Sequence, residues 1–310
     1  MQALLHAIAQ MASLPSEAQR LFHGRGGLFP GCEQWSLDAF PPVFVLTSFA
    51  PAGADQLAAV HEALARRLAE IAPGQALNWV YQCRAEGQLE TRLMAGQVPE
   101  PHVVSEGGLR YLVHVLKGQN HGLFLDMAEG RRWLAEQVAA QPQPERLKVL
   151  NLFAYTCAFS VVALRAGAGQ VINVDMSDGA LATGRRNHVL NGLSSGASFL
   201  AHDIFNSWGK IGRAGPYPLI ILDPPSYQKG SFVATKDYAR LMRRLPDLLT
   251  PGGQVLLCLN TPKLGMAFLQ DQMAELAPDL RFLRRLENPP AFADISGERA
   301  LKVLVYQAPA

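Results

Sequence analysis

The stretch Lys148-Val-Leu-Asn-Leu-Phe-Ala-Tyr-Thr-Cys-Ala-Phe-Ser160 decides the fold of this chain. Residues Val149 to Phe153 are apolar on both faces, which is typical of a strand in a parallel sheet that helices cover. A turn of small residues follows, and a helix is expected from about Phe159 to Ala166. Open α/β sheets bind their ligands beyond the carboxyl ends of such strands, so this turn is a candidate cofactor-binding loop.

Length and composition describe a globular chain with a balanced charge. The 310 residues are 49% hydrophobic, which is enough for a substantial core. Lys and Arg number 28 against 26 acids, so net charge makes no strong claim on nucleic acid or membrane. The apolar runs fall short of the roughly 20 residues of a membrane span, and the amphipathic N-terminus does not resemble a signal peptide. We therefore expect a cytoplasmic protein that does not associate with membranes.

The four cysteines are far apart in the sequence, and they lack the CxxC or His-spaced partners of a metal site. Neither zinc nor a disulfide framework is expected, and we predict no metal. Packing is the favoured role for each thiol, because free cysteine is among the most buried residue types. A nucleophilic thiol is the alternative at Cys157 and Cys258.

The sequence pattern of residues 1–108 predicts a small α+β domain, and this region carries no chemical motif. We expect helices at about 2–22 and 54–71, a strand at 43–47, and a hairpin of 76–82 with 89–95. The loop His23-Gly-Arg-Gly-Gly27 can contact phosphate through its arginine and backbone, but a simple turn is the favoured interpretation.

Residues 109–310 alternate between strands and helices, which favours a parallel sheet. After a further strand within 106–117, helices are expected at 123–141, 177–190, 235–249 and 263–276. Strands are expected at 148–153, 170–175, 198–201, 217–222, 254–259, 281–286 and 301–306.

Three acids, Asp175, Asp203 and Asp223, end successive strands and should share one edge with the opening loop. The first suits ribose hydroxyls and the second an adenine amino group. The loop lacks GxGxxG, which argues against a pyrophosphate ligand. A helix cap or a solvated strand end is the alternative role for each acid.

Three segments together resemble the class I S-adenosylmethionine-dependent methyltransferases, and most closely the bacterial group that makes 5-methylcytosine and 7-methylguanine in 23S ribosomal RNA. These segments are GQNHGLFLD (118–126), LNLFAYTCAFS (150–160) and LDPPSY (222–227). The resemblance covers residue 106 to the end. It implies an α/β fold with a Rossmann-like seven-stranded sheet whose last strand is antiparallel, and S-adenosylmethionine as cofactor, with S-adenosylhomocysteine as product. It also implies an RNA partner, 23S rRNA or a ribosomal precursor.

Carried over to this chain, the resemblance implies a set of cofactor contacts. Asp126 would lie near the amino group, Asp175 with Met176 at the ribose, and Asp203 with Ile204 at the adenine. The methionine part would contact Phe153, Ala154, Tyr155 and Cys157.

Asp223 and Pro224 would separate the sulfonium from the target base. The residues implied in catalysis are Asp223, Pro224, Pro225, Ser226, Tyr227 and Asn260. Two departures stand out: Cys157 replaces the family's usual glycine, and GQNHG replaces the commoner GQKTG, which removes a cation.

The 5-methylcytosine members use a cysteine just after the fifth strand, where this chain has Asn260-Thr261-Pro262. Cys258 lies earlier and should point into the sheet, so we predict direct transfer to a base nitrogen without a covalent step. Tyr227 can stack on a flipped base. Lys229, Lys236 and Arg240 can meet phosphate, although charged helix faces are usually only solvated.

Other functions stay open at this point. The methyl acceptor can be a protein or a small molecule, or the fold can serve as a non-catalytic cofactor-binding module. A nicotinamide-dependent oxidoreductase is disfavoured by the absent GxGxxG and by Asp223-Pro-Pro-Ser-Tyr227.

Overall fold

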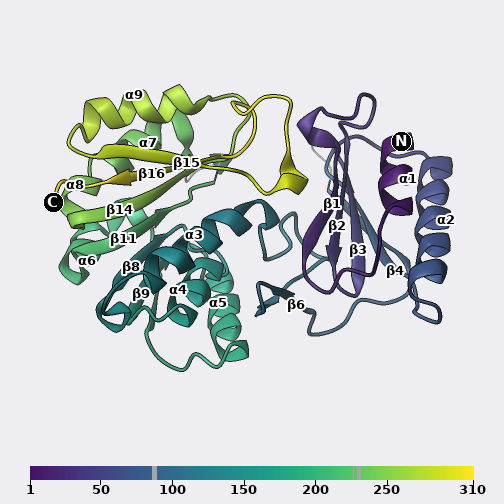
Figure 1. The fold of residues 1–310 in the computed structure, drawn as a ribbon, viewed down its shortest axis with the longest axis horizontal. Helices are drawn as coiled ribbons and strands as arrows, with labels where there is room; N and C mark the ends of the chain where they lie inside the picture. The colour runs from purple at the N-terminus through teal and green to yellow at the C-terminus, as the bar shows by residue number, and fades with distance from the viewer. Residues whose placement is uncertain (86–88, 226, 229–231) are drawn as a thin grey trace. The chain divides into compact units, whose positions relative to one another are not determined.

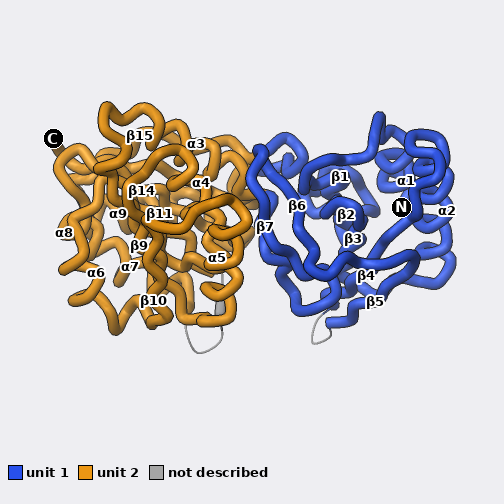
Figure 2. Tube along the Cα trace, turned by 90° about the horizontal axis from the view of Figure 1, so that it is seen from below, with its two compact units in different colours: residues 1–125, 289–296 blue, residues 126–288, 297–310 orange. Residues whose placement is uncertain are grey.

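The computed structural model describes residues 1–85, 89–225, 227–228 and 232–310 (Figure 1). The chain divides into two compact units, which Figure 2 colours separately. Unit 1 comprises residues 1–125 and 289–296, and unit 2 comprises residues 126–288 and 297–310. Residue 108, where the sequence divides into two regions, lies in the turn of the hairpin β6 (Val103–Glu106) and β7 (Leu109–Leu112), which is part of unit 1. No helix in the described ranges has the length and apolarity that crossing a membrane requires.

Unit 2 is built on a seven-stranded sheet of order β10-β9-β8-β11-β14-β16-β15. The first five strands in this order run parallel, and β16 is antiparallel to both of its neighbours. The expected Rossmann-like sheet with an antiparallel last strand is thereby confirmed. Its strands are β8 (Lys148–Leu152), β9 (Gln170–Asp175), β10 (Ala197–Ala201), β11 (Tyr217–Leu222), β14 (Leu249–Leu259), β15 (Arg281–Leu286) and β16 (Lys302–Gln307).

Both faces of this sheet are covered, because its strands are apolar on both sides. Leu150 and Leu152 of β8 join one hydrophobic cluster, and Val149 joins the other. The first cluster includes residues of α6 (Trp208–Ala214), α7 (Ala234–Met242), α8 (Leu245–Leu248) and α9 (Met266–Leu276). The second includes residues of α3 (Ala128–Ala139) and α4 (Ala158–Arg165), and the remaining helix is α5 (Asp178–Leu190). Short 3-10 turns are η2 (Leu125–Met127), η3 (Pro144–Arg146) and η4 (Ile204–Asn206).

The helix expected over 235–249 is wrong as one element. The chain instead forms α7 and α8, which are separated at Arg243 and Arg244, and β14 already begins at Leu249. Pro246 explains the break. In a continuous helix its ring would clash with the carbonyl of Met242, and it has no N–H to donate. A small hairpin of β12 (Tyr227–Gln228) and β13 (Phe232–Val233) precedes α7.

Unit 1 contains a five-stranded sheet of order β1-β2-β3-β4-β5, in which only the β3–β4 pairing is parallel. The helix α2 packs Leu57, Val60 and Leu64 into its core. The elements are α1 (Gln2–Ala9), β1 (Gln19–His23), η1 (Gly24–Gly26), β2 (Trp35–Phe40), β3 (Val43–Ser48), α2 (Ala54–Ile71), β4 (Asn78–Cys83), β5 (Glu90–Ala95) and η5 (Pro290–Phe292).

The helix expected over residues 2–22 is also wrong in extent. It ends at Ala9, and residues 19–23 form the edge strand β1, paired antiparallel with β2. Pro15 between the two segments disfavours a continuous helix, and the pairing with β2 decides the conformation of the second segment.

Candidate functional site

The loop from β8 to α4 has an unusual backbone. Phe153, Tyr155 and Cys157 adopt left-handed φ values of 58°, 47° and 62°. Such conformations are uncommon outside glycine, and they persist only where surrounding contacts hold them. Here the Ala154 N–H donates to the Val174 carbonyl at 3.1 Å, and the Cys157 N–H donates to the Ala154 carbonyl at 2.7 Å. The loop is therefore held against the end of β9.

Asp175 fastens this loop to the next one. Its Oδ2 accepts from the Tyr155 N–H at 2.8 Å, and its Oδ1 accepts from the Ser177 N–H at 2.8 Å. The residue is partly exposed, and each carboxylate oxygen has further acceptor capacity for a ligand hydroxyl. Met176, beside it, is exposed. Asp175 thus has a structural role and remains able to bind a ligand.

Asp203 has the helix-cap role that was the alternative for each acid. Its Oδ1 accepts from the Phe205 N–H at 2.9 Å, and its Oδ2 accepts from the Asn206 side-chain amide at 2.5 Å. These bonds cap η4 and orient the buried Ile204. Asp203 itself is still partly exposed at the edge of the sheet.

Asp223 follows β11, the strand next to β8, and its ionisation is strongly perturbed. Burial, and then the charge of Asp126, raise the pKa of its carboxyl to about 7. Arg131 and a hydrogen bond from Cys258 act in the opposite direction. The residue as a whole keeps some exposed surface, so its carboxyl is desolvated without being sealed from a ligand.

A desolvated carboxyl at Asp223 with the charge of the partly exposed Asp126 nearby favours a positively charged ligand. Asp126 and Asp223 are close enough for one charge to shift the pKa of the other. A sulfonium and an ammonium group, both of which S-adenosylmethionine carries, would relieve this repulsion. The acidic edge therefore fits that cofactor by its charge.

Cys258 lies in β14, is fully buried, and donates its hydrogen bond to Asp223. Burial, and then the charges of Asp223 and Asp126, raise the pKa of its thiol well above the usual value. The hydroxyl of Tyr238, a residue of α7, donates a hydrogen bond to the Cys258 carbonyl. Because the thiolate is the nucleophilic form, this thiol is poorly suited to attack a base.

Cys157 packs beneath the loop with Ala154 and Leu181 and is fully buried. Burial and the charge of Asp175 raise the pKa of its thiol. The thiol faces the interior, so the contact of Cys157 with the methionine part of the cofactor stays a prediction for its backbone. The side chain is a packing group.

The structure describes some of the other residues expected at the site and leaves others outside its described ranges. Pro224 is buried, Pro225 is half-buried, and Asn260 is exposed directly after β14. Phe153 contacts Phe232 edge-on, with ring centroids 5.5 Å apart. Outside the described residues lie Ser226, the Tyr227 side chain and Lys229.

The expected phosphate contacts on α7 have different environments. Arg240 donates to Asp237 at 2.8 Å and lies over the Phe205 ring at 3.8 Å, whereas Lys236 is exposed. Arg240 therefore pairs and stacks within unit 2 while its side chain stays about half exposed, and the phosphate contact stays a prediction for both residues.

A buried polar network beneath the loop was missed by sequence reasoning. Asn151 donates to Asn173 at 2.9 Å, and Asn173 donates to Ser160 at 3.0 Å. Ser160 contacts His188 Nε2 at 2.9 Å, and His188 Nδ1 lies 2.7 Å from the Gly184 carbonyl. The signal that could have revealed it is an asparagine inside each of two apolar strands. The network joins β8, β9, α4 and α5.

Comparison with known proteins gives the family. Residues 19–307 match the family described as S-adenosylmethionine-dependent methyltransferase. Ribosomal RNA large subunit methyltransferase I of Aeromonas salmonicida is 32% identical over 203 residues, covering 63% of this chain and 50% of that protein. The protein of the same name from Klebsiella pneumoniae is 29% identical over 282 residues, covering 88% and 68%. The chain spans about half the length of the first of these relatives.

Solved structures share the fold. A Streptococcus mutans protein described as an S-adenosylmethionine-dependent methyltransferase has a TM-score of 0.81 at 23% identity, covering 99% of this chain and 81% of that one. The tRNA m1G37 methyltransferase of Methanocaldococcus jannaschii has a TM-score of 0.60 at 14% identity, covering 90% and 77%. From the family match over residues 19–307, this chain belongs to the S-adenosylmethionine-dependent methyltransferases.

Proposed function

We propose that this protein methylates a base nitrogen in RNA, with ribosomal RNA of the large subunit as the favoured substrate, in the cytoplasm. The relatives from Aeromonas salmonicida and Klebsiella pneumoniae carry ribosomal RNA methyltransferase names, and they support an RNA acceptor. The observation that carries the chemistry is Asp223, a carboxyl with a pKa of about 7 at the end of a central strand.

The cofactor would lie along the acidic edge of the sheet. Asp126 would bind its ammonium group, and the backbone of residues 153–157 would surround the methionine part. Asp175 would accept hydrogen bonds from the ribose, and Asp203 with Ile204 would hold the adenine. S-adenosylmethionine supplies an electrophilic methyl group when bound. The partial exposure of Asp126, Asp175 and Asp203 supports this assignment.

A base nitrogen that carries hydrogen must lose a proton when it is methylated. Asp223 is suited to accept that proton, since a base with a pKa near the working pH is substantially deprotonated and still basic enough to take a proton. Pro224, Pro225, Ser226, Tyr227 and Asn260 would hold the base plane in line with the methyl group.

The burial of the cysteines supports direct transfer. All four are buried, and the Cys258 thiol, the nearest in sequence to the position that the 5-methylcytosine members use, has a raised pKa. A covalent adduct needs an accessible thiolate, so the observed burial supports a nitrogen target.

The test is transfer of a labelled methyl group from S-adenosylmethionine into total RNA of a strain that lacks this gene, compared with RNA of the parent strain. We expect label in a large-subunit ribosomal RNA of the deletion strain only, and nuclease mapping to one nucleotide. Calorimetry with S-adenosylmethionine and with NAD checks the cofactor. Label in protein or small molecules, or cofactor binding without transfer to any fraction, would overturn the proposal.

A further inference from the structure

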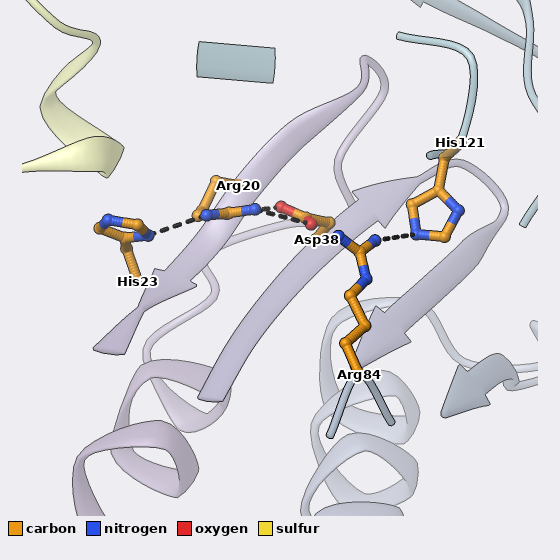
Figure 3. Close-up of polar contacts among 5 residues, drawn as sticks. All are labelled: Arg20, His23, Asp38, Arg84 and His121. Carbon is orange, nitrogen blue, oxygen red and sulfur yellow. Dashed lines mark hydrogen bonds and ion pairs between the residues drawn. The ribbon is translucent and has the colours of Figure 1, made fainter. Parts of the chain in front are cut away.

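Unit 1 contains three arginines within interaction range of one another, two of which flank one carboxylate (Figure 3). Arg20 binds Asp38 through two hydrogen bonds, from Nε to Oδ1 at 2.7 Å and from Nη2 to Oδ2 at 3.0 Å. Figure 3 shows the guanidinium groups of Arg20 and Arg84 on either side of the Asp38 carboxylate. Asp38 is buried in β2 and Arg20 is largely buried in β1, so the pair is a fixed part of the sheet.

Arg84 follows β4 and contacts two uncharged groups. Its Nε donates to Gln82 Oε1 at 2.5 Å, and its Nη2 lies 3.3 Å from His121 Nε2. Burial, followed by the charge of Arg84, lowers the pKa of His121 to about 4, so the imidazole is neutral at pH 7. Among the residues that the structure describes, Arg84 has no ion-pair contact within 4 Å.

Arg25 is presented by the loop His23-Gly-Arg-Gly-Gly27, whose glycines are required by close packing. A Cβ on Gly24 would lie 1.8 Å from the Cys32 carbonyl oxygen, and one on Gly26 would lie 2.1 Å from that of Ala293. The backbone on both sides of Arg25 is thus tightly fixed. The expected turn is present as η1, and its glycines are closely packed.

The Arg25 side chain is exposed and stacks on the Phe49 ring, with Cζ 3.8 Å from the ring centroid. In the described part of the chain it forms no ion pair. Although one edge of the side chain is exposed, desolvation by the surrounding protein atoms, and then the charge of Arg20, lower the pKa of Arg25. The charges of Arg20 and Arg25 therefore lie within interaction range. The ring holds the guanidinium plane while its N–H edges remain available.

The charges of this cluster do not balance. Arg20, Arg25 and Arg84 contribute three positive charges. Asp38 contributes one negative charge, and Asp294, whose charge acts on the neighbouring His23, contributes a second, so one positive charge remains in excess. His23, 2.8 Å from Arg20, adds none at pH 7, because burial and then Arg20 lower its pKa to about 4. The whole chain has a formal net charge of only +2. Like charges held together in partly desolvated positions favour an anion.

The geometry of arginine indicates the kind of anion. A guanidinium presents a planar fork of donors that matches phosphate, and stacking on an aromatic ring is a further feature of arginines that recognise nucleic acids. Arg20 also lies over the Phe292 ring, with Cζ 4.4 Å from its centroid. Two arginines with aromatic supports beside a third one therefore suit a backbone phosphate better than a carboxylate of a peptide.

We propose that Arg25 and Arg84, supported by the Arg20–Asp38 pair, bind a backbone phosphate of the RNA substrate through unit 1. This inference rests on the proposed function for the identity of the substrate. The contact positions the RNA without reading its sequence, because phosphates carry no base information.

The test uses Arg25→Gln, Arg84→Gln and the double variant in the full chain. Arg92→Gln is the matched control, because Arg92 is exposed in the same unit, pairs with Glu90 at 3.0 Å and faces the Tyr81 ring. RNA affinity is measured by fluorescence anisotropy across salt concentrations, and methyl transfer gives KM and kcat. Calorimetry with S-adenosylmethionine and thermal melts confirm that each variant is folded.

We expect each single variant to raise Kd and KM for RNA about 3- to 10-fold and the double variant by more, with kcat unchanged. The slope of log K against log salt should fall by about 1 for each lost contact. Arg25→Lys should restore only part of the affinity, since it keeps the charge without the fork. Arg92→Gln should behave as wild type.

Failures of the two proposals are distinguishable. If the wild type methylates RNA while Arg25→Gln and Arg84→Gln keep its affinity and salt slope, the phosphate site is wrong and the function stands. If the wild type methylates no RNA, the proposed function is wrong. The phosphate site is then also wrong if RNA binding does not depend on Arg25 and Arg84, and it stands if RNA binding does. Arginine-dependent binding to phosphatidylglycerol vesicles in preference to RNA also overturns the site. Because Arg25 is exposed, we expect its variants to fold. They therefore decide the test even if Arg84→Gln misfolds.

Discussion

Gly184 on α5 faces Cys157 so closely that a β carbon at position 184 would lie 2.5 Å from the Cys157 Sγ. Real β carbons do not approach another atom so nearly, so the thiol occupies space that only a glycine leaves open. The family that the loop resembles usually has glycine in place of Cys157. In this chain the thiol and Gly184 are a complementary pair.

Gly184→Ala is therefore expected to lower the free energy of unfolding by about 1–3 kcal/mol through overpacking, although alanine normally favours a helix. Adding Cys157→Gly should recover most of this loss, because it removes the thiol and suits the left-handed φ of 62°. Urea denaturation of the four proteins gives the coupling energy. Gly179→Ala is the control, since the nearest atom to its added Cβ is 4.0 Å away. Additive effects of the two substitutions would show that the pair is independent.

Asp175→Asn is expected to weaken S-adenosylmethionine binding about 10- to 100-fold, because a charge-assisted acceptor for the loop and the ribose becomes neutral. Isothermal calorimetry measures this affinity. Asp178→Asn is the matched control in the first turn of α5, where Asp178 is exposed and lies 3.9 Å from Arg185. Equal affinities for Asp175→Asn and wild type would remove Asp175 from the cofactor site.

The pH profile should report Asp223. Its pKa of about 7 means that the carboxylate is the minority form below pH 7 and the majority form above it. If it accepts a proton from the base, kcat/KM rises tenfold per pH unit below about pH 7 and levels off above it. Asp223→Asn should remove this limb and lower kcat at least about 100-fold. An unchanged profile in the Asn variant would assign the proton acceptor elsewhere.

Cys258→Ala should retain methyl transfer, because a buried thiol with a raised pKa does not form the attacking thiolate. The variant loses a hydrogen bond that lowers the Asp223 pKa, so the acid limb of its profile should move to higher pH. Transfer kinetics at several pH values measure both effects. Loss of transfer with intact cofactor binding would instead favour covalent catalysis at cytosine C5.

The expected elements of unit 2 depend mainly on local patterns, and most of them are confirmed. The strands expected at 170–175, 217–222 and 281–286 coincide with β9, β11 and β15. Ser177 caps α5 as expected by accepting from the Ala180 N–H at 3.1 Å. Strand order and direction follow from the resemblance, since apolar periodicity alone does not specify which strands pair.

The site was predictable by residue type and position along the strands, but its electrostatics were not. Asp175, Asp203 and Asp223 were expected from their places after strands. The pKa of Asp223 depends on Asp126, which is 97 positions away in the sequence, and on burial that only packing produces. Likewise, the polar network of Asn151 and Asn173 can be recognised only once the pairing of β8 with β9 brings the two side chains together.

The sequence by itself determined the parallel sheet, its apolar faces and the acids at the carboxyl ends of its strands, because side-chain periodicity and capping act between near neighbours. Only the tertiary structure decided that residues 19–23 form a strand, that Cys157 faces Gly184, and that Arg84 lies within interaction range of Arg20, Arg25 and Asp38. These features arise from contacts between segments far apart in the chain. Pairing, burial and Coulomb interactions depend on distance in space, which no local pattern specifies.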